Sequence, residues 1–120
     1  MIRKLLEIDL LFTLIRKEDW KAFSESGIFE PDSLEEQGYI QCFLGSQIQE
    51  AANSFFSKEN DLLLIVIDPL RLQVPIKHEK EGDQTYPNVY GSFSIDAIID
   101  RIVLRKGKKG DFSVKVKHFD

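Results

Sequence analysis

The sequence contains few of the residues on which disulfide-linked, metal-bound or membrane-spanning proteins depend. It has one cysteine, Cys42, so no internal disulfide can form, and a reducing compartment such as the cytoplasm is the expected setting. One cysteine and two histidines are too few for a structural zinc site, and we expect no metal. No stretch is long and apolar enough to span a membrane. Glu7 and Asp9 interrupt the first apolar run, so we expect no signal peptide.

Positive charge is also in short supply. Sixteen Lys and Arg residues stand against twenty Asp and Glu residues, which gives a formal net charge of −4. Proteins that bind nucleic-acid duplexes usually carry a basic excess, so nucleic acid is not the expected partner. The basic residues that cluster lie near the C-terminus: Arg101, Arg105, Lys106, Lys108, Lys109, Lys115 and Lys117. Such a run is more typical of a solvated strand edge than of a phosphate-binding surface.

Apolar residues, in contrast, are plentiful. The 120 residues include 42% hydrophobic residues and nine Phe, enough to fill one core, whereas the chain is too short for two domains. We therefore predict a single domain over residues 1–120. Its centre is predicted to be residues 38–67, in which a short strand over 39–43 leads into a helix and then a buried strand over 62–67. Six consecutive aliphatic residues make that last strand a central one, covered on both faces.

The helix in this central unit has a predicted start and a predicted buried side. Ser46 and Gln49 have the spacing of a capping box, which indicates that the helix begins at Ser46. An apolar stripe at helical spacing follows: Ile48, Ala51, Ala52, Phe55 and Phe56. We expect this stripe to pack against the sheet.

Strands outnumber helices in the rest of the chain. Upstream, the patterns predict a strand over 6–15, a helix over 17–24 that ends at Gly27, and one capped turn over 31–36. Downstream they predict an edge strand over 72–79 with Pro75 in it, then a polar loop over 80–85 and an irregular stretch over 86–91. A helical turn over 94–99 and a strand over 102–104 follow. The last predicted elements are a hairpin turn over 107–110 and a strand over 112–118. Short connections between strands favour an α+β fold, with a curved mixed or antiparallel sheet and two or three short helices.

Several short motifs occur in an order typical of one family. They are Trp20 followed by Gly27, then Pro31-Asp32-Ser33-Leu34, Gly38-Tyr39-Ile40-x-Cys42, Ala52-Asn53-x-Phe55-Phe56, Leu62-Leu63-Leu64-Ile65-x-Ile67-Asp68, Glu79, and Tyr86-Pro87-x-Val89-Tyr90-Gly91. With these motifs the chain resembles the small bacterial domain-of-unknown-function 952 family, from the first strand to Ile99. The resemblance implies a fold like that of the ADP-ribosyltransferases, a split sheet around a cleft that could hold a nicotinamide dinucleotide. It implies no established activity, so NAD is a candidate cofactor by analogy of fold.

The chain departs from that family at two positions. Members usually carry histidine where this chain has Gln41, and again where it has Asn88. An imidazole titrates near neutral pH, whereas a carboxamide only donates and accepts hydrogen bonds. The two replacements predict a site whose catalysis is weakened or altered, and they leave open whether the chain is an enzyme. If it is active, the resemblance implies ADP-ribosyl or related glycosyl transfer.

Five residues form the candidate site. Glu79 is the catalytic candidate, because the resemblance implies a glutamate that bonds a ribose hydroxyl and stabilises an oxocarbenium-like transition state. Gln41, Asn88, Tyr90 and Gly91 are the candidate ligand contacts, through amide hydrogen bonds, a stacking ring and a close backbone approach. Each has a structural alternative: a solvated carboxylate, an amide satisfied by backbone, a turn asparagine, or a packed tyrosine before a turn glycine.

Two functions follow from these residues. The first is a domain that binds a nucleotide-type ligand, such as NAD or ADP-ribose, in a cleft. The second is a non-enzymatic protein-interaction module on the same scaffold, which the two missing histidines favour. Convergence of Gln41, Glu79, Asn88 and Tyr90 would favour the first, and their separation would favour the second. Cys42 is expected to be a buried apolar residue and His78 a solvated imidazole. The oligomeric state is left open.

Overall fold

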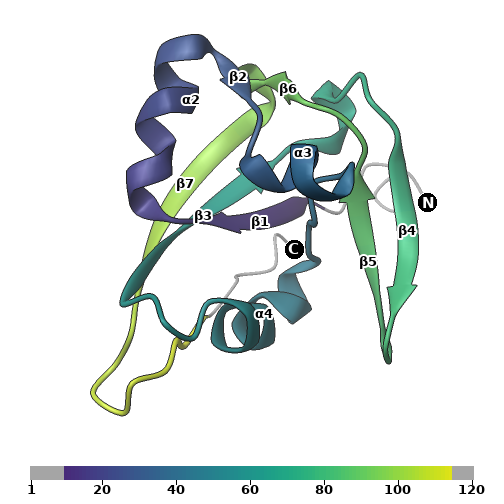
Figure 1. Ribbon diagram of the computed structural model, residues 1–120. Coiled ribbons are helices and arrows are strands. Elements are labelled where there is room, and N and C mark those ends of the chain that lie inside the picture. The colour runs from purple at the N-terminus through teal and green to yellow at the C-terminus, as the bar shows by residue number, and fades with distance from the viewer. Residues whose placement is uncertain (1–9, 115–120) are drawn as a thin grey trace, which may run out of the picture.

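The structure is a computed structural model that describes residues 10–114, and these form a mixed α+β fold of short helices and antiparallel sheets (Figure 1). The strands are β1 (Leu11–Ile15), β2 (Ile28–Phe29), β3 (Asp61–Ile67), β4 (Ile76–Glu81), β5 (Gln84–Val89), β6 (Phe93–Ser94) and β7 (Ile98–Arg105). The α-helices are α2 (Trp20–Ser26), α3 (Asp32–Gln37) and α4 (Ile48–Phe55). Short 3₁₀ turns add η1 (Lys17–Asp19), η2 (Gly45–Gln47), η3 (Pro69–Arg71) and η4 (Ile95–Ala97).

The main sheet has the strand order β1-β3-β7, and both pairings are antiparallel. β3 is the central strand, and its residues 62–67 are all buried, which confirms the prediction from the aliphatic run. β7 runs from Ile98 to Arg105 and is therefore much longer than the predicted 102–104. Its register with β3 shifts between Val66 and Ile67, which marks a bulge at this end of the sheet.

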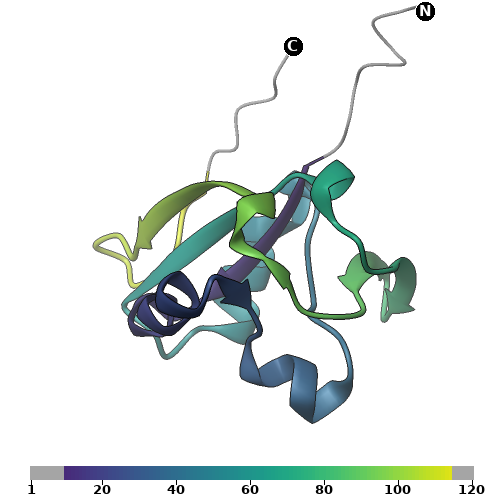
Figure 2. The ribbon, with the colours of Figure 1, turned by 90° about the horizontal axis from the view of Figure 1, so that it is seen from above.

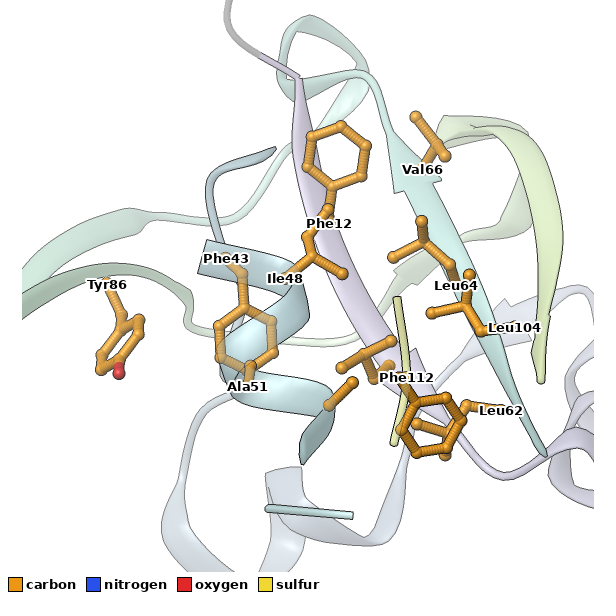
Figure 3. Packing of buried hydrophobic residues seen from close by; sticks show 12 residues of the cluster. Phe12, Phe43, Ile48, Ala51, Leu62, Leu64, Val66, Tyr86, Leu104 and Phe112 are labelled. Atoms are coloured by element: carbon orange, nitrogen blue, oxygen red, sulfur yellow. The ribbon is translucent and has the colours of Figure 1, made fainter. Parts of the chain in front are cut away.

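Alternation along β3 sends side chains into two separate cores, one on each face of the main sheet. On one face, Leu62, Leu64 and Val66 pack with residues of β1 and α4, as Figure 3 shows. On the other face, Leu63, Ile65 and Ile67 pack with side chains from α2 and α3. The main sheet is therefore the middle layer, with α4 on one side and the two earlier helices on the other (Figures 1 and 2).

The remaining strands form two-stranded sheets, β2 with β6 and β4 with β5. The β4–β5 hairpin lies at the opposite end of the molecule from β7 in both ribbon views (Figures 1 and 2). The sequence predicts a polar loop over 80–85 and an irregular stretch over 86–91, and both predictions are wrong. The chain instead turns over Gly82-Asp83 alone, and the strands pair on either side of this turn. β4 also begins later than predicted, at Ile76, after Pro75.

The segment over 40–43 joins the main sheet to the hairpin. The predicted continuous strand is absent here, and two isolated bridges take its place. Phe43 bridges Phe12 of β1, and its backbone nitrogen donates to the Phe12 carbonyl oxygen at 2.6 Å. Ile40 bridges Val89 of β5, and its backbone nitrogen donates to the Val89 carbonyl oxygen at 2.8 Å. Because the segment crosses from one sheet to the other, it is too short to form a ladder with either.

Two of the three α-helices within residues 10–114 end at glycines in the left-handed region, where a side chain would be strained. α2 ends at Gly27, with a φ of 77°, which confirms the predicted stop. α3 extends to Gln37 and ends at Gly38, with a φ of 87°, so it is longer than the single turn predicted. Pro31 precedes it, and the predicted side-chain cap is not formed.

The start of α4 also differs from the prediction. Ser46 and Gln49 do not form a capping box, because a 3₁₀ turn precedes the helix. Gln47 is the N-cap residue of α4 but makes no side-chain cap bond to it, and its side chain caps the 3₁₀ turn instead. The Gln47 Oε1 accepts a hydrogen bond of 3.0 Å from the N–H of Leu44. The buried stripe is confirmed for Ile48 and for the two alanines that follow it. Phe55, at the end of the helix, is 50% exposed.

The described part of the chain ends against α4. Lys106 and Phe112 form an antiparallel bridge across the predicted hairpin turn. The predicted strand over 112–118 is not formed within residues 112–114, and its remainder lies outside the described residues. Positions 6–9 of the first predicted strand lie outside them too. Phe112 is only 1% exposed and belongs to the core beneath α4 (Figure 3).

Candidate functional site

The β4–β5 hairpin places polar and aromatic side chains on one of its faces. In the antiparallel register, Glu79 is opposite Tyr86 and Lys77 is opposite Asn88. Directly opposed residues share a face, and so do alternate residues on each strand. The face therefore carries Lys77, Glu79 and Glu81 from β4 together with Tyr86 and Asn88 from β5. The other face of β5 carries Pro87 and Val89, which are buried.

The Glu79 carboxylate accepts hydrogen bonds from two neighbouring side chains. Its Oε1 accepts a hydrogen bond of 2.6 Å from the Tyr90 hydroxyl and one of 3.0 Å from Asn88 Nδ2. These two bonds, Tyr90 first and Asn88 second, lower the pKa of the Glu79 carboxyl, and the charge of Lys77 adds to the effect. Partial desolvation acts in the opposite direction but does not outweigh the bonds. Glu79 is therefore an ionised hydrogen-bond acceptor at neutral pH.

Tyr90 extends the site beyond the end of β5. Its hydrogen bond to Glu79 raises the pKa of the phenol to about 12, with desolvation as a second cause. Its ring lies against the ring of Tyr39, with the centroids 5.3 Å apart and the planes tilted by 35°. The Lys77 ammonium lies 4.4 Å from the centroid of the Tyr90 ring. The phenol thus holds the carboxylate, while the ring forms part of an aromatic pair next to a cation.

Gln41 reaches the same face from the segment over 40–43. Because Ile40 pairs with Val89, the next residue in the antiparallel pairing places Gln41 beside Asn88. The Gln41 Nε2 donates a hydrogen bond of 3.0 Å to Glu81 Oε2 at the surface. The structure therefore brings Gln41, Glu79, Asn88 and Tyr90 to one face of the hairpin.

Asn88 and Gly91 have specific structural surroundings. Asn88 is the last residue but one of β5 and is 4% exposed, so it is a buried strand residue and not a turn residue. Gly91 has a φ of 151°, and a Cβ built on it would lie 2.6 Å from Val74 Cγ1. The close approach that this glycine allows is therefore made by Val74. A role for Gly91 in ligand binding stays a prediction.

Two further reactive side chains lie away from these groups. Cys42 is fully buried, and burial raises the pKa of its thiol to about 12, so it is a neutral thiol packed in the core. His78 is exposed on β4, opposite Pro87. Within residues 10–114, no group of three or more His, Cys, Asp and Glu side chains could hold a metal ion. No helix in that part of the chain is long and apolar enough to cross a membrane.

Comparison with known proteins agrees with the motifs in the sequence. The model of the family described as "Protein of unknown function (DUF952)" matches residues 14–101, which is more than half of the chain. The chain belongs to this family. No curated protein matches this member of the family.

Solved structures match this member of the family over most of its length. The crystal structure of protein CC0527 from Caulobacter crescentus has a TM-score of 0.78 and 23% identity, and the match covers 87% of this chain and 93% of that one. The solution NMR structure of the same protein has a TM-score of 0.71 and 21% identity, with 87% and 91% covered. At this identity the likeness shows that the two proteins share a fold.

In this family member, the two positions at which the resemblance implies histidines are side by side, at Gln41 and Asn88. Neither carboxamide can transfer a proton usefully, and Glu79 is ionised while Tyr90 is protonated at neutral pH. The cluster can therefore orient and bind through hydrogen bonds, but it lacks a group that titrates near pH 7.

Four residues that contribute to this face are not among the candidates from the sequence. Lys77 falls in the predicted edge strand and Glu81 in the predicted polar loop, and Tyr39 and Tyr86 appear within family motifs. Glu81 lies two residues after Glu79, so extending the alternation of β4 by one step would have placed it on the same face. Tyr39 meets Tyr90 only because residues 40 and 89 pair, and no local pattern contains that information.

Proposed function

We propose that this protein binds a ribose-containing nucleotide of the NAD or ADP-ribose type on the polar face of the β4–β5 hairpin. The observation that carries the proposal is the Glu79 carboxylate, which Tyr90 and Asn88 hold in one orientation. Both bonds go to Oε1, which leaves Oε2 of the same half-buried carboxylate for a ligand hydroxyl. A ribose offers hydroxyl donors, and hydrogen bonds to an oriented carboxylate are among the strong ones.

The aromatic pair of Tyr39 and Tyr90 supports a nucleotide rather than a simple sugar. A base can stack on a tyrosine ring, and the two rings are only 5.3 Å apart and next to the carboxylate. Lys77 supplies a positive charge beside these rings, which suits the phosphate-bearing side of a nucleotide. We also propose that the fold is like that of the ADP-ribosyltransferases, and the resemblance of the motifs supports this part of the proposal.

The proposed site binds its ligand with little or no turnover. An anionic Glu79 could stabilise positive charge that develops on a ribose carbon, which is the chemistry of glycosyl transfer. Acid–base assistance would have to come from Gln41, Asn88 or Tyr90, and none of them exchanges a proton near pH 7. We propose a single domain in the cytoplasm, where the buried free thiol of Cys42 would stay reduced.

The test is a thermal-shift and calorimetric titration of the full chain with NAD and with ADP-ribose. We expect a stabilising shift at millimolar ligand. Glu79→Gln keeps an oxygen that Tyr90 and Asn88 can bond but removes the charge, and it should weaken binding about tenfold. Glu25→Gln, on the exposed surface of α2, is the matched control and should bind as the parent does. No shift with either ligand would contradict the proposal.

An interaction module is the second candidate, and one observation favours it. The three apolar side chains Ile99, Ile102 and Val103 on β7 are 46%, 42% and 40% exposed, and β7 is an outer strand of the main sheet as described. Exposed strand edges with apolar side chains can pair with another chain. If this edge binds a second copy, Val103→Lys should abolish concentration-dependent association in sedimentation experiments. A monomeric parent protein would argue against this second function.

A further inference from the structure

The buried carboxamide of Asn88 has one atom whose bonding is incomplete. Its Nδ2 donates to Glu79, but its Oδ1 is buried and has no hydrogen-bond partner. Among the described residues, it is the one buried side-chain nitrogen or oxygen in this condition. A buried acceptor without a donor loses its bond to water and gains none in return, so such atoms usually have a partner. This oxygen belongs to the same cluster as Glu79.

Two of the donors that neighbour Asn88 on the hairpin face already bond elsewhere. The Tyr90 hydroxyl donates to Glu79, and the Gln41 Nε2 donates to Glu81. A third donor, the ammonium of Lys77 opposite Asn88, lies over the Tyr90 ring. The two carboxylates of Glu79 and Glu81 outnumber this one positive charge. A group that enters here must therefore donate a hydrogen bond and must not carry a negative charge.

We infer that the ligand donates an N–H of a carboxamide on its base to Asn88 Oδ1, an inference that rests on the proposed function. For a ligand to reach this buried oxygen, we infer that the Gln41 side chain beside Asn88 moves aside, since its hydrogen bond to Glu81 is solvent-exposed. The site then distinguishes a carboxamide from the corresponding carboxylate. A carboxylate offers no donor, and it adds a negative charge beside Glu79.

The phosphates of the ligand stay outside this group of acceptors. A phosphate next to Glu79 would place two anions together, whereas the Lys77 ammonium lies over the ring of Tyr90. The geometry therefore assigns the nicotinamide end of an NAD-type ligand, and not its pyrophosphate, to Asn88. This assignment gives the inference a readout of its own, because two ligands can differ in the carboxamide alone.

The test compares NAD with its nicotinic-acid analogue, in which the carboxamide is a carboxylate, by isothermal titration of the unmodified full chain. We expect NAD to bind at least tenfold more tightly, because the analogue leaves Asn88 Oδ1 unpaired and repels Glu79. Asn88→Leu, which has nearly the same size but no acceptor, should reduce this preference to less than threefold. Because the comparison of ligands uses the unmodified protein, it stands even if Asn88→Leu does not fold.

Several results would overturn the inference while leaving the proposed function in place. These are equal affinities for NAD and its analogue, or ADP-ribose, which has no nicotinamide, binding as tightly as NAD. A crystal structure with a water on Asn88 Oδ1 both in the free protein and with NAD bound would overturn it too. If neither NAD nor ADP-ribose binds, the proposed function fails, and this inference fails with it.

Discussion

The contact between Asn53 and Phe112 gives a sharp test of how this fold is held together. The Asn53 carboxamide bonds both backbone groups of Phe112: Nδ2 donates to the carbonyl oxygen at 2.9 Å, and Oδ1 accepts from the N–H at 2.7 Å. One turn earlier on α4, Gln49 Oε1 accepts from the N–H of Val114 at 3.0 Å. Two helix side chains thus replace a neighbouring strand for this stretch of backbone. We predict that Asn53→Ala will lower the free energy of unfolding.

The size of the effect follows from the two bonds that are lost. A net hydrogen bond contributes about 1 kcal/mol, and leaving a buried partner unsatisfied costs about 1–3 kcal/mol. Because both Phe112 groups lose their partner, we expect a loss of about 2–4 kcal/mol. Phe112→Ala removes a ring that is 1% exposed and should cost about 3–5 kcal/mol by leaving a cavity. Either loss is a large fraction of the roughly 5–15 kcal/mol that stabilises a small protein.

Urea denaturation followed by circular dichroism measures these losses, and amide hydrogen exchange locates them. In Asn53→Ala, the Phe112 amide should lose protection even under conditions in which β3 amides keep theirs. Ser54→Ala is the matched control, because Ser54 is the next residue of the same helix and is exposed. Its effect should stay within about 0.5 kcal/mol. A loss below about 0.5 kcal/mol in Asn53→Ala, with the Phe112 amide still protected, would refute this reasoning.

Three further predictions concern the hairpin and the residues that follow it. Gly91→Ala should cost about 2 kcal/mol or more in urea denaturation, since its φ is 151° and its Cβ would meet Val74 at 2.6 Å. Adding Val74→Ala should recover only part of the loss, and full recovery would show that the backbone conformation costs nothing. In ultraviolet titration Tyr90 should ionise near pH 12, and nearer pH 10 in Glu79→Gln. Because an unfolded tyrosine ionises near pH 10, the stability from this bond is present below pH 10 and is lost between about 10 and 12. If Tyr90 ionises at the same pH in Glu79→Gln as in the parent protein, the result would contradict the hydrogen bond between Tyr90 and Glu79. The lowered pKa of Glu79 affects stability at acid pH. The stability that the ionised Glu79 adds to the folded protein is present above about pH 4.5, and it is lost as the pH falls through the pKa of Glu79 in the folded state.

The sequence by itself determined the elements whose pattern is local and strong. The aliphatic run at 62–67 became the central strand, because side chains buried on both faces suit no other position. Gly27 ended α2, because only glycine adopts the left-handed conformation there without strain. Membership of the family was also visible, because the order of its motifs survives without any structure.

Tertiary structure decided what depends on pairing between distant segments. The β4–β5 hairpin was missed because its residues are mostly polar and its strands are stabilised by each other, so neither carries a clear apolar alternation. Ser46 lost the capping position to Gln47, since the chain needed a 3₁₀ turn to pass from the bridge at Phe43 into α4. Phe55 was left half exposed at the helix end, where no layer covers it within the described residues.

In the candidate site, too, the sequence predicts the chemical groups and the tertiary structure decides how they are arranged. Glu79, Gln41, Asn88 and Tyr90 could be named from the sequence as chemical groups, through the family motifs in which they lie. Their meeting on one face follows from the pairing of residue 40 with residue 89 and from the register of the hairpin. So does the ionised state of Glu79, because its pKa is set by the two donors that the fold brings to one oxygen. A sequence lists the donors and acceptors, but only the register of the strands determines which of them meet.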